Sequence, residues 1–192
     1  MTDQELDAML ATLAPVLPET DETRALHERP TALRDAVLAY ASAGWPVFPL
    51  RVGMKTPATQ RGFYDASTDP EQITAWWTAT PWANIGTPTG LRFDVVDIDA
   101  PAGYASFATM RDSLRATGST WPTVLGVAYT GNHGRHVLVP ATGNGNTTAT
   151  MPGLDYRGRG GYVVLAPSRL APDGRRYAWL TPPAASILGG AE

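Results

Sequence analysis

Residues 92–100 read RFDVVDIDA and place three aspartates in a run that otherwise resembles a buried strand. Side chains two positions apart on a strand share a face, so we expect Asp97 and Asp99 to project together and Asp94 to project the opposite way. A carboxylate in an apolar strand is costly unless something pairs with it. A hard divalent cation is one candidate, because Mg²⁺ and Mn²⁺ favour oxygen ligands. On this spacing alone, solvation at the strand end or pairing with arginine is the favoured explanation.

The overall composition predicts one folded domain. The chain has 192 residues, 43% of them hydrophobic, with 17 prolines and 19 glycines that indicate many turns and short elements. Cysteine is absent, which excludes disulfides, thiolate nucleophiles and cysteine-based zinc sites. The start, MTDQELDAML, lacks the basic and apolar regions of a signal peptide, and no apolar run approaches the ~18 residues of a membrane span. We therefore expect a cytoplasmic protein without membrane contacts.

Charge is unevenly distributed although the net charge is only −3. Residues 1–30 hold seven acidic residues and two arginines, whereas residues 130–180 hold six arginines and two aspartates. An arginine-rich half is typical of a local site for phosphates. A solvated basic surface explains the same charges equally well.

The order of expected elements predicts an α+β fold. Hydrophobic periodicity and capping residues indicate helices, whereas short apolar runs between glycine-rich turns indicate strands. The expected helices are one that begins at the Thr2/Glu5 capping box and others at 31–43, from Asp69-Pro70 onward and at 102–116. The expected strands are 45–50, 92–98 and the runs TVLGVAY, RHVLVP, YVVLAP and RYAWL, with 84–90 read as a turn-rich approach. Helices and short strands thus come first and a mainly antiparallel sheet follows.

Two further segments carry candidate site residues. Asp155 precedes a glycine-rich turn in LDYRGRGG and would either form a structural salt bridge or complete a carboxylate trio with Asp97 and Asp99. The segment YTGNHGRH (129–136) is a turn between two strands, and such turns can direct backbone N–H groups at an anion. Thr130 and Arg135 could add donors there. His136 is as consistent with a strand-edge histidine bonded to the backbone as with a functional one.

Taken together, these segments resemble the N-terminal primase-polymerase domain of the archaeo-eukaryotic primase superfamily, found in plasmid, phage and mobile-element replication proteins. The resemblance extends from about residue 32 to residue 179. It is carried by GWPVFPL with Lys55-Thr56-Pro57, ITAWW, NIGTPTG, VVDIDA, TGNHGRH, PGLDYRGRGGYVVLAPS and RYAW. It implies a catalytic domain at 31–182 with an RRM-like central sheet. Residues 1–30 would be an acidic helix and connector, and 183–192 a tail that could lead to a further domain.

The resemblance also implies the chemistry of the site. Asp97, Asp99 and Asp155 would bind two Mg²⁺ or Mn²⁺ ions, and His136 would contact the phosphates of an incoming nucleoside triphosphate. The other candidates for nucleotide contacts are Thr130, Arg135, Lys55, Arg157 and Ser168. The partners would be a single-stranded or primed DNA template and a helicase domain or protein, in the cytoplasm of a bacterial cell or a phage-infected host.

The expected function is a DNA primase/polymerase that performs template-directed nucleotidyl transfer. Two other readings remain open. The domain could hold single-stranded DNA or a nucleotide without chemistry, or it could be a metal-dependent nuclease, because carboxylate trios also serve hydrolysis. Nucleases often add a histidine or lysine that activates water, and the sequence offers no clear candidate for that role.

Overall fold

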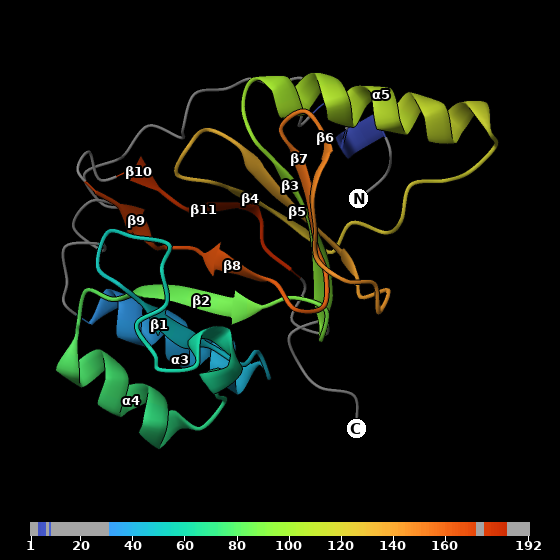
Figure 1. Ribbon diagram of the computed structural model, residues 1–192. Coiled ribbons are helices and arrows are strands. Elements are labelled where there is room, and N and C mark those ends of the chain that lie inside the picture. The colour runs from blue at the N-terminus through green and yellow to red at the C-terminus, as the bar shows by residue number, and fades with distance from the viewer. Residues whose placement is uncertain (1–3, 7, 9–30, 172–174, 184–192) are drawn as a thin grey trace.

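The structure is a computed structural model that describes residues 4–6, 8, 31–171 and 175–183 (Figure 1). The helix expected after Thr2 lies mostly outside these residues, although Leu6 is fully buried in the core. The elements are α3 (Ala32–Ser42), β1 (Phe48–Leu50), the 3-10 helix η1 (Gly62–Asp65), α4 (Pro70–Ala79), β2 (Asn84–Pro88), β3 (Phe93–Ile98), α5 (Ala102–Ala116), β4 (Gly126–Tyr129), β5 (Arg135–Pro140), β6 (Thr147–Met151), β7 (Leu154–Arg157), β8 (Tyr162–Leu165), β9 (Arg169–Leu170), β10 (Arg175–Arg176) and β11 (Ala178–Thr181).

A six-stranded antiparallel sheet forms the centre of the molecule, in the order β11-β4-β5-β3-β7-β6. β3, the strand of the RFDVVDIDA stretch, lies in the middle and pairs with β5 on one side and β7 on the other. α5 covers one face of this sheet, at the top of Figure 1. Val96 and Ile98 face that helix and pack in one core cluster with Phe107 of α5. The alternate side chains of β3, Phe93, Val95 and Asp97, therefore project to the opposite face of the sheet.

A second, three-stranded antiparallel sheet has the order β1-β2-β8. α3 and α4 lie beneath it in Figure 1, and Val37 and Trp77 from these helices pack in a core cluster with Ile85 of β2. The same cluster includes Phe93 and Val95 of β3, so it joins the two sheets. α4 begins as expected at Asp69, whose side chain accepts a hydrogen bond from the Glu71 N–H at 3.0 Å.

The α+β class and the antiparallel pairing are confirmed, but one local expectation is wrong. Residues 84–90 were expected to be turn-rich, whereas Asn84–Pro88 form the fully buried central strand of the smaller sheet. Asp155 lies within β7, and the expected glycine-rich turn follows that strand before β8. YVVLAP does form a strand, β8, but it belongs to the second sheet. The RRM-like arrangement and the domain limits stay predictions.

Within the described residues, no helix combines the length and the apolar character needed to cross a membrane.

Candidate active site

Three polar side chains lie in one row across neighbouring strands. Asp97 of β3 is directly opposite His136 of β5 and directly opposite Asp155 of β7. Directly opposed residues in a sheet project to the same face, so the pairing brings together three residues that are far apart in sequence. The row faces away from α5, because Val96 and Ile98 occupy the α5 face.

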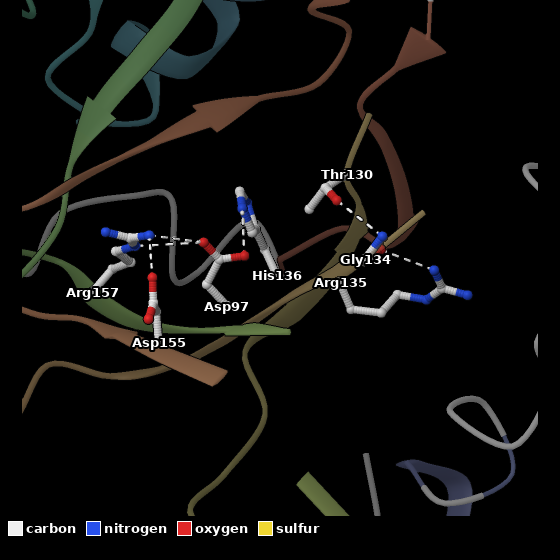
Figure 2. A network of polar contacts seen from close by, with 7 residues as sticks. All are labelled: Asp97, Thr130, Gly134, Arg135, His136, Asp155 and Arg157. Carbon is white, nitrogen blue, oxygen red and sulfur yellow. Dashed lines mark hydrogen bonds and ion pairs between the residues drawn. The ribbon is translucent and has the colours of Figure 1, made fainter. Parts of the chain in front are cut away.

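Arg157 neutralises the two carboxylates of this row (Figure 2). Its Nη2 lies 2.6 Å from Asp155 Oδ2 and 3.3 Å from Asp97 Oδ2. The other oxygen of Asp155 accepts a hydrogen bond from the Ala149 N–H of β6 at 2.6 Å. The arginine partner considered from the sequence is therefore present, and its guanidinium supplies positive charge between two acids that would otherwise repel each other.

His136 is buried next to Asp97. Its Nε2 lies 3.5 Å from Asp97 Oδ1, and its ring centroid lies 5.7 Å from that of the buried Tyr177. Burial lowers the pKa of His136 below its ordinary value, and the nearby Asp97 carboxylate only partly offsets this. The imidazole is therefore neutral near pH 7, and it can donate a hydrogen bond to a phosphate without carrying a full positive charge.

Asp99 follows the end of β3 and is exposed. Its backbone N–H donates to the Gly153 carbonyl at 2.8 Å, and its carbonyl accepts from the Gly103 N–H at 2.8 Å, so the first turn of α5 fixes its position. Partial desolvation raises the pKa of Asp99, and the negative charges of Asp97 and Asp155 add to the increase. All three acids are thus close enough to interact electrostatically.

The donor set suits a hard divalent cation in its chemistry. It consists of carboxylate oxygens, which repel one another. This repulsion contributes to the raised pKa of Asp99, and a bound cation would relieve it. In the part of the chain that the structure describes, no group of three acidic or histidine side chains is arranged as a closed metal site. The cationic group that contacts both Asp97 and Asp155 in this structure is the Arg157 guanidinium.

Two members of the row, Asp97 and His136, open into a cleft of about 240 Å³ between the two sheets, and Arg157 links this cleft to Asp155. Asp97, His136 and Arg157 line it from the larger sheet, and Tyr162 of β8 and Lys55 line it from the other side. The Tyr162 hydroxyl donates to the Lys55 carbonyl at 3.1 Å, which fixes the Lys55 backbone at the rim. The cleft thus presents two basic side chains and one neutral histidine beside Asp97.

A glycine turn forms one wall of the cleft. Gly160 and Gly161 line it, and the turn is fixed from both sides. Thr89 Oγ1 donates to the Gly158 carbonyl at 2.7 Å, and the Arg159 N–H donates to the Asn144 carbonyl at 2.7 Å. Gly160 has φ +88°, a conformation that favours glycine, and a Cβ there would meet no atom within 4 Å. The wall is therefore open backbone that a ligand can approach closely.

Arg135 lies on the opposite face of the sheet from His136, because consecutive strand residues alternate. Its guanidinium carbon lies 3.6 Å from the ring centroid of Tyr129, and its Nη1 donates to the Gly134 carbonyl at 2.9 Å. Figure 2 shows the side chain directed away from the row. The structure does not bring Arg135 to the cleft, where a contact with a nucleotide would require it.

The turn at 130–134 uses several of its polar groups internally. Thr130 Oγ1 accepts from the Gly134 N–H at 3.1 Å, and the Thr130 carbonyl accepts from the His133 N–H at 3.1 Å. These groups stabilise the turn that leads into β5, and they are not aimed outward as an anion site would require. The position of Thr130 therefore favours a role in holding the turn.

Ser168 also has a structural partner. It is fully buried, and its Oγ accepts a hydrogen bond from the Ile85 N–H of β2 at 2.9 Å. The structure therefore brings Asp97, Asp155, His136, Arg157 and Lys55 together with Asp99 alongside, and separates Arg135 and Ser168 from them. Sequence reasoning missed Tyr177, which packs under His136, and Phe63, which lines the cleft. No local pattern around either aromatic residue indicates that it lies beside the row.

Comparison with known proteins identifies the family of the chain. No curated protein matches the chain. The family model described as "Bifunctional DNA primase/polymerase, N-terminal" matches residues 37–187, which is most of the chain and includes every residue of the row. The extent expected from the motifs, about 32–179, is similar. The chain belongs to the Prim-Pol family, the N-terminal domain of bifunctional DNA primase/polymerases, and so has a primase/polymerase-type function in replication.

Proposed function

We propose that the cleft performs template-directed nucleotidyl transfer from nucleoside triphosphates. The observation that carries the proposal is the row Asp155–Asp97–His136, which three adjacent strands align beside Lys55 and Arg157. Carboxylates next to basic groups and a neutral hydrogen-bond donor are the parts that phosphoryl chemistry needs, because its catalysis is mainly positioning and electrostatic stabilisation.

Asp97, Asp99 and Asp155 would hold divalent metal ions, which fits their donor chemistry and the raised pKa of Asp99. When bound, Mg²⁺ or Mn²⁺ would lower the pKa of the attacking 3′-hydroxyl and stabilise the charge of the leaving pyrophosphate. His136 would donate a hydrogen bond to a phosphate oxygen from its fixed place beside Asp97. Lys55 would place a positive charge at the rim of the cleft, where a triphosphate enters.

Arg157 would have two roles. Before metal and nucleotide bind, it neutralises Asp97 and Asp155, as its contacts of 3.3 and 2.6 Å indicate. If the two carboxylates bound metal, the guanidinium would be released. It would then contact the triphosphate from the same wall of the cleft. Arginine suits this exchange, because its planar donors pair equally well with carboxylate and phosphate.

The direct test is nucleotide incorporation by the purified chain. Labelled nucleotides would be offered with Mg²⁺ or Mn²⁺ on a primed DNA template and on unprimed single-stranded DNA. We expect metal-dependent extension whose product sequence follows the template. Failure with every nucleotide type, metal and template by a folded protein would overturn the proposal.

The Arg157 ion pairs also favour a second candidate, a module that binds single-stranded DNA or a nucleotide without chemistry. A permanent salt bridge between Arg157 and its two acids would satisfy the site with no metal. Saturable binding of a nucleoside triphosphate that needs no divalent metal, together with no incorporation, would support this candidate.

A further inference from the structure

A basic loop at residues 51–65 forms the rim of the cleft, and its backbone is firmly held. The Gly53 carbonyl accepts from the Ala171 N–H at 2.9 Å, and the Met54 carbonyl accepts from Asn84 Nδ2 at 2.9 Å. Asn84 is itself a buried residue of β2. Bonds to Asn84 of β2 and to Ala171, which follows β9, thus hold the loop backbone at residues 53–54 in a fixed conformation.

Exposed apolar side chains gather in this loop. Tyr64 is 72% exposed, and Val52 and Met54 are each 53% exposed. Burial of such groups would be favourable, so a fixed loop that leaves them in water is typical of a binding surface. The same loop holds Arg51, Lys55 and Arg61 and no acidic residue before Asp65.

Aromatic rings run in series from the core to this surface. Phe48 of β1 lies 5.5 Å from Tyr162, Tyr162 lies 5.9 Å from Phe63, and Phe63 lies 4.3 Å from Tyr64 (ring centroids). The inner rings are buried or half-buried, and Tyr64 ends the series in solvent. The packed rings behind Tyr64 hold its ring in place, so a planar ligand could stack on it with little loss of side-chain entropy.

Two hollows lie on either side of η1. Phe63 lines the catalytic cleft, whereas Tyr64 lines a second, larger hollow of about 760 Å³. Gln60, Arg61, Gln72 and Trp76 also line the second hollow. The two neighbouring aromatic residues of η1 therefore form a ridge, here called the Phe63–Tyr64 ridge, between the reaction site and a polar hollow with an aromatic wall.

The acidic residues of the second hollow are already paired. Asp65 accepts hydrogen bonds from the Arg61 N–H at 2.9 Å and from Arg61 Nε at 2.7 Å, and these bonds lower its pKa. Asp69 caps α4. Glu71, in the first turn of α4, is exposed nearby. Arg51 and Lys55 can therefore attract a phosphate backbone. Proteins that bind single strands combine such positive charge with aromatic side chains on which the bases stack.

We propose that the Phe63–Tyr64 ridge binds single-stranded nucleic acid, with a base stacked on Tyr64 and the strand crossing η1 from the cleft into the second hollow. The proposal rests on the proposed function, because the strand that leaves the cleft over this ridge is the template. It adds the path of that strand, which the row of site residues does not define.

The experiment measures DNA binding apart from catalysis. Fluorescence anisotropy would follow a 5′-labelled oligo-dT with the full chain, without divalent metal or nucleotide. We expect Tyr64→Ala to weaken binding about tenfold and Tyr64→Phe to retain parental affinity, because stacking needs the ring alone. Leu91→Ala is the matched control, since Leu91 is 63% exposed and lines neither hollow.

A second measurement locates the contact. Photocrosslinking with 5-iodouracil oligonucleotides, followed by mass spectrometry, should place the adduct within residues 60–76. Equal affinities of parent, Tyr64→Ala and Leu91→Ala, no binding by the parent, or the lack of any adduct within residues 60–76 would overturn the ridge proposal. If the parent extends primers while Tyr64→Ala binds DNA normally, the ridge proposal alone fails. If Tyr64-dependent binding is seen without any nucleotide incorporation, the proposed function alone fails.

Discussion

Asp97 and Asp155 lie directly opposite each other on β3 and β7, and both carboxylates contact the Nη2 atom of Arg157. Their side chains are 15% and 20% exposed, so water screens the two charges only partly. Removal of the guanidinium would leave two neighbouring carboxylates without their cation. The affinity of the site for any other cation must then rise, because the same electrostatic energy becomes available to it.

We therefore expect Arg157→Gln to bind Mn²⁺ about tenfold more tightly than the parent and a nucleoside triphosphate more weakly. The two changes have opposite signs, which loss of folding alone would not produce. Isothermal titration calorimetry with Mn²⁺ alone, and then with nucleotide, measures both. Arg159→Gln is the matched control, because Arg159 belongs to the same turn and is exposed. Parental Mn²⁺ affinity in Arg157→Gln would contradict the exchange role.

Asp97→Asn and Asp155→Asn test the row itself. Each change keeps the shape of the side chain and removes a negative charge, so we expect nucleotide incorporation to fall about a thousandfold or more, or ~4 kcal/mol of transition-state stabilisation. Thermal unfolding should change little for Asp97→Asn, because the amide oxygen can still accept from Arg157. It should fall more for Asp155→Asn, because both Asp155 oxygens accept hydrogen bonds, from the Ala149 N–H and from Arg157, and an amide offers only one acceptor oxygen. Asp112→Asn is the control, since Asp112 is an exposed residue of α5 that pairs with Arg115 at 3.1 Å. Incorporation at the parental rate by either variant would remove these acids from the mechanism.

A substitution on the α5-covered face of the same sheet should change stability but not metal binding. Asp94 is fully buried on the α5 face, where it accepts hydrogen bonds from the Tyr156 hydroxyl and, at 2.7 Å, from the Thr142 N–H. Tyr156→Phe would remove one donor from a buried carboxylate, and we expect the free energy of unfolding to fall by about 1–3 kcal/mol. Urea denaturation measures this loss. Mn²⁺ affinity should stay at the parental value, and a large change in it would show that the two faces are coupled.

Strand periodicity explains which parts of the site could be foreseen. The alternation along RFDVVDID correctly separates Asp94 from Asp97, and the structure buries Asp94 on the opposite face. The same rule places the neighbours Arg135 and His136 on opposite faces, so one phosphate site cannot use both side chains, although the charge of Arg135 suits a phosphate.

Long-range pairing explains what could not be foreseen. The four-residue strand β7 lies between Pro152-Gly153 and the RGRGG turn, and both flanks indicate turns. The position of Asp155 opposite Asp97 depends on the register of β7 against β3, which no local pattern fixes. Asn84–Pro88 contains a glycine and a proline, yet tertiary burial between β1 and β8 makes it a strand.

A last prediction concerns stability at alkaline pH. Tyr40 of α3 donates a hydrogen bond to the Ala166 carbonyl at 2.8 Å and accepts one from Trp179 Nε1 at 2.7 Å. Burial raises the pKa of Tyr40 from 10.0 to about 12, and the bond from Trp179 only partly opposes the increase. Because the folded-state pKa is the higher one, this contribution to stability is complete below pH 10 and is lost as the pH rises toward 12.

We therefore expect Tyr40→Phe to lower the free energy of unfolding by about 1–2 kcal/mol at pH 8, where both hydrogen bonds of the hydroxyl are lost. Between pH 10 and 12 the stability of the parent should fall more steeply than that of Tyr40→Phe, so the two curves converge. The variant will keep part of the alkaline loss, because burial also raises the pKa of Tyr177. Urea denaturation at pH 8, 10 and 11 measures the curves, and Tyr64→Phe serves as the exposed control. Parallel curves for parent and Tyr40→Phe would show that Tyr40 ionises equally in the folded and unfolded chains.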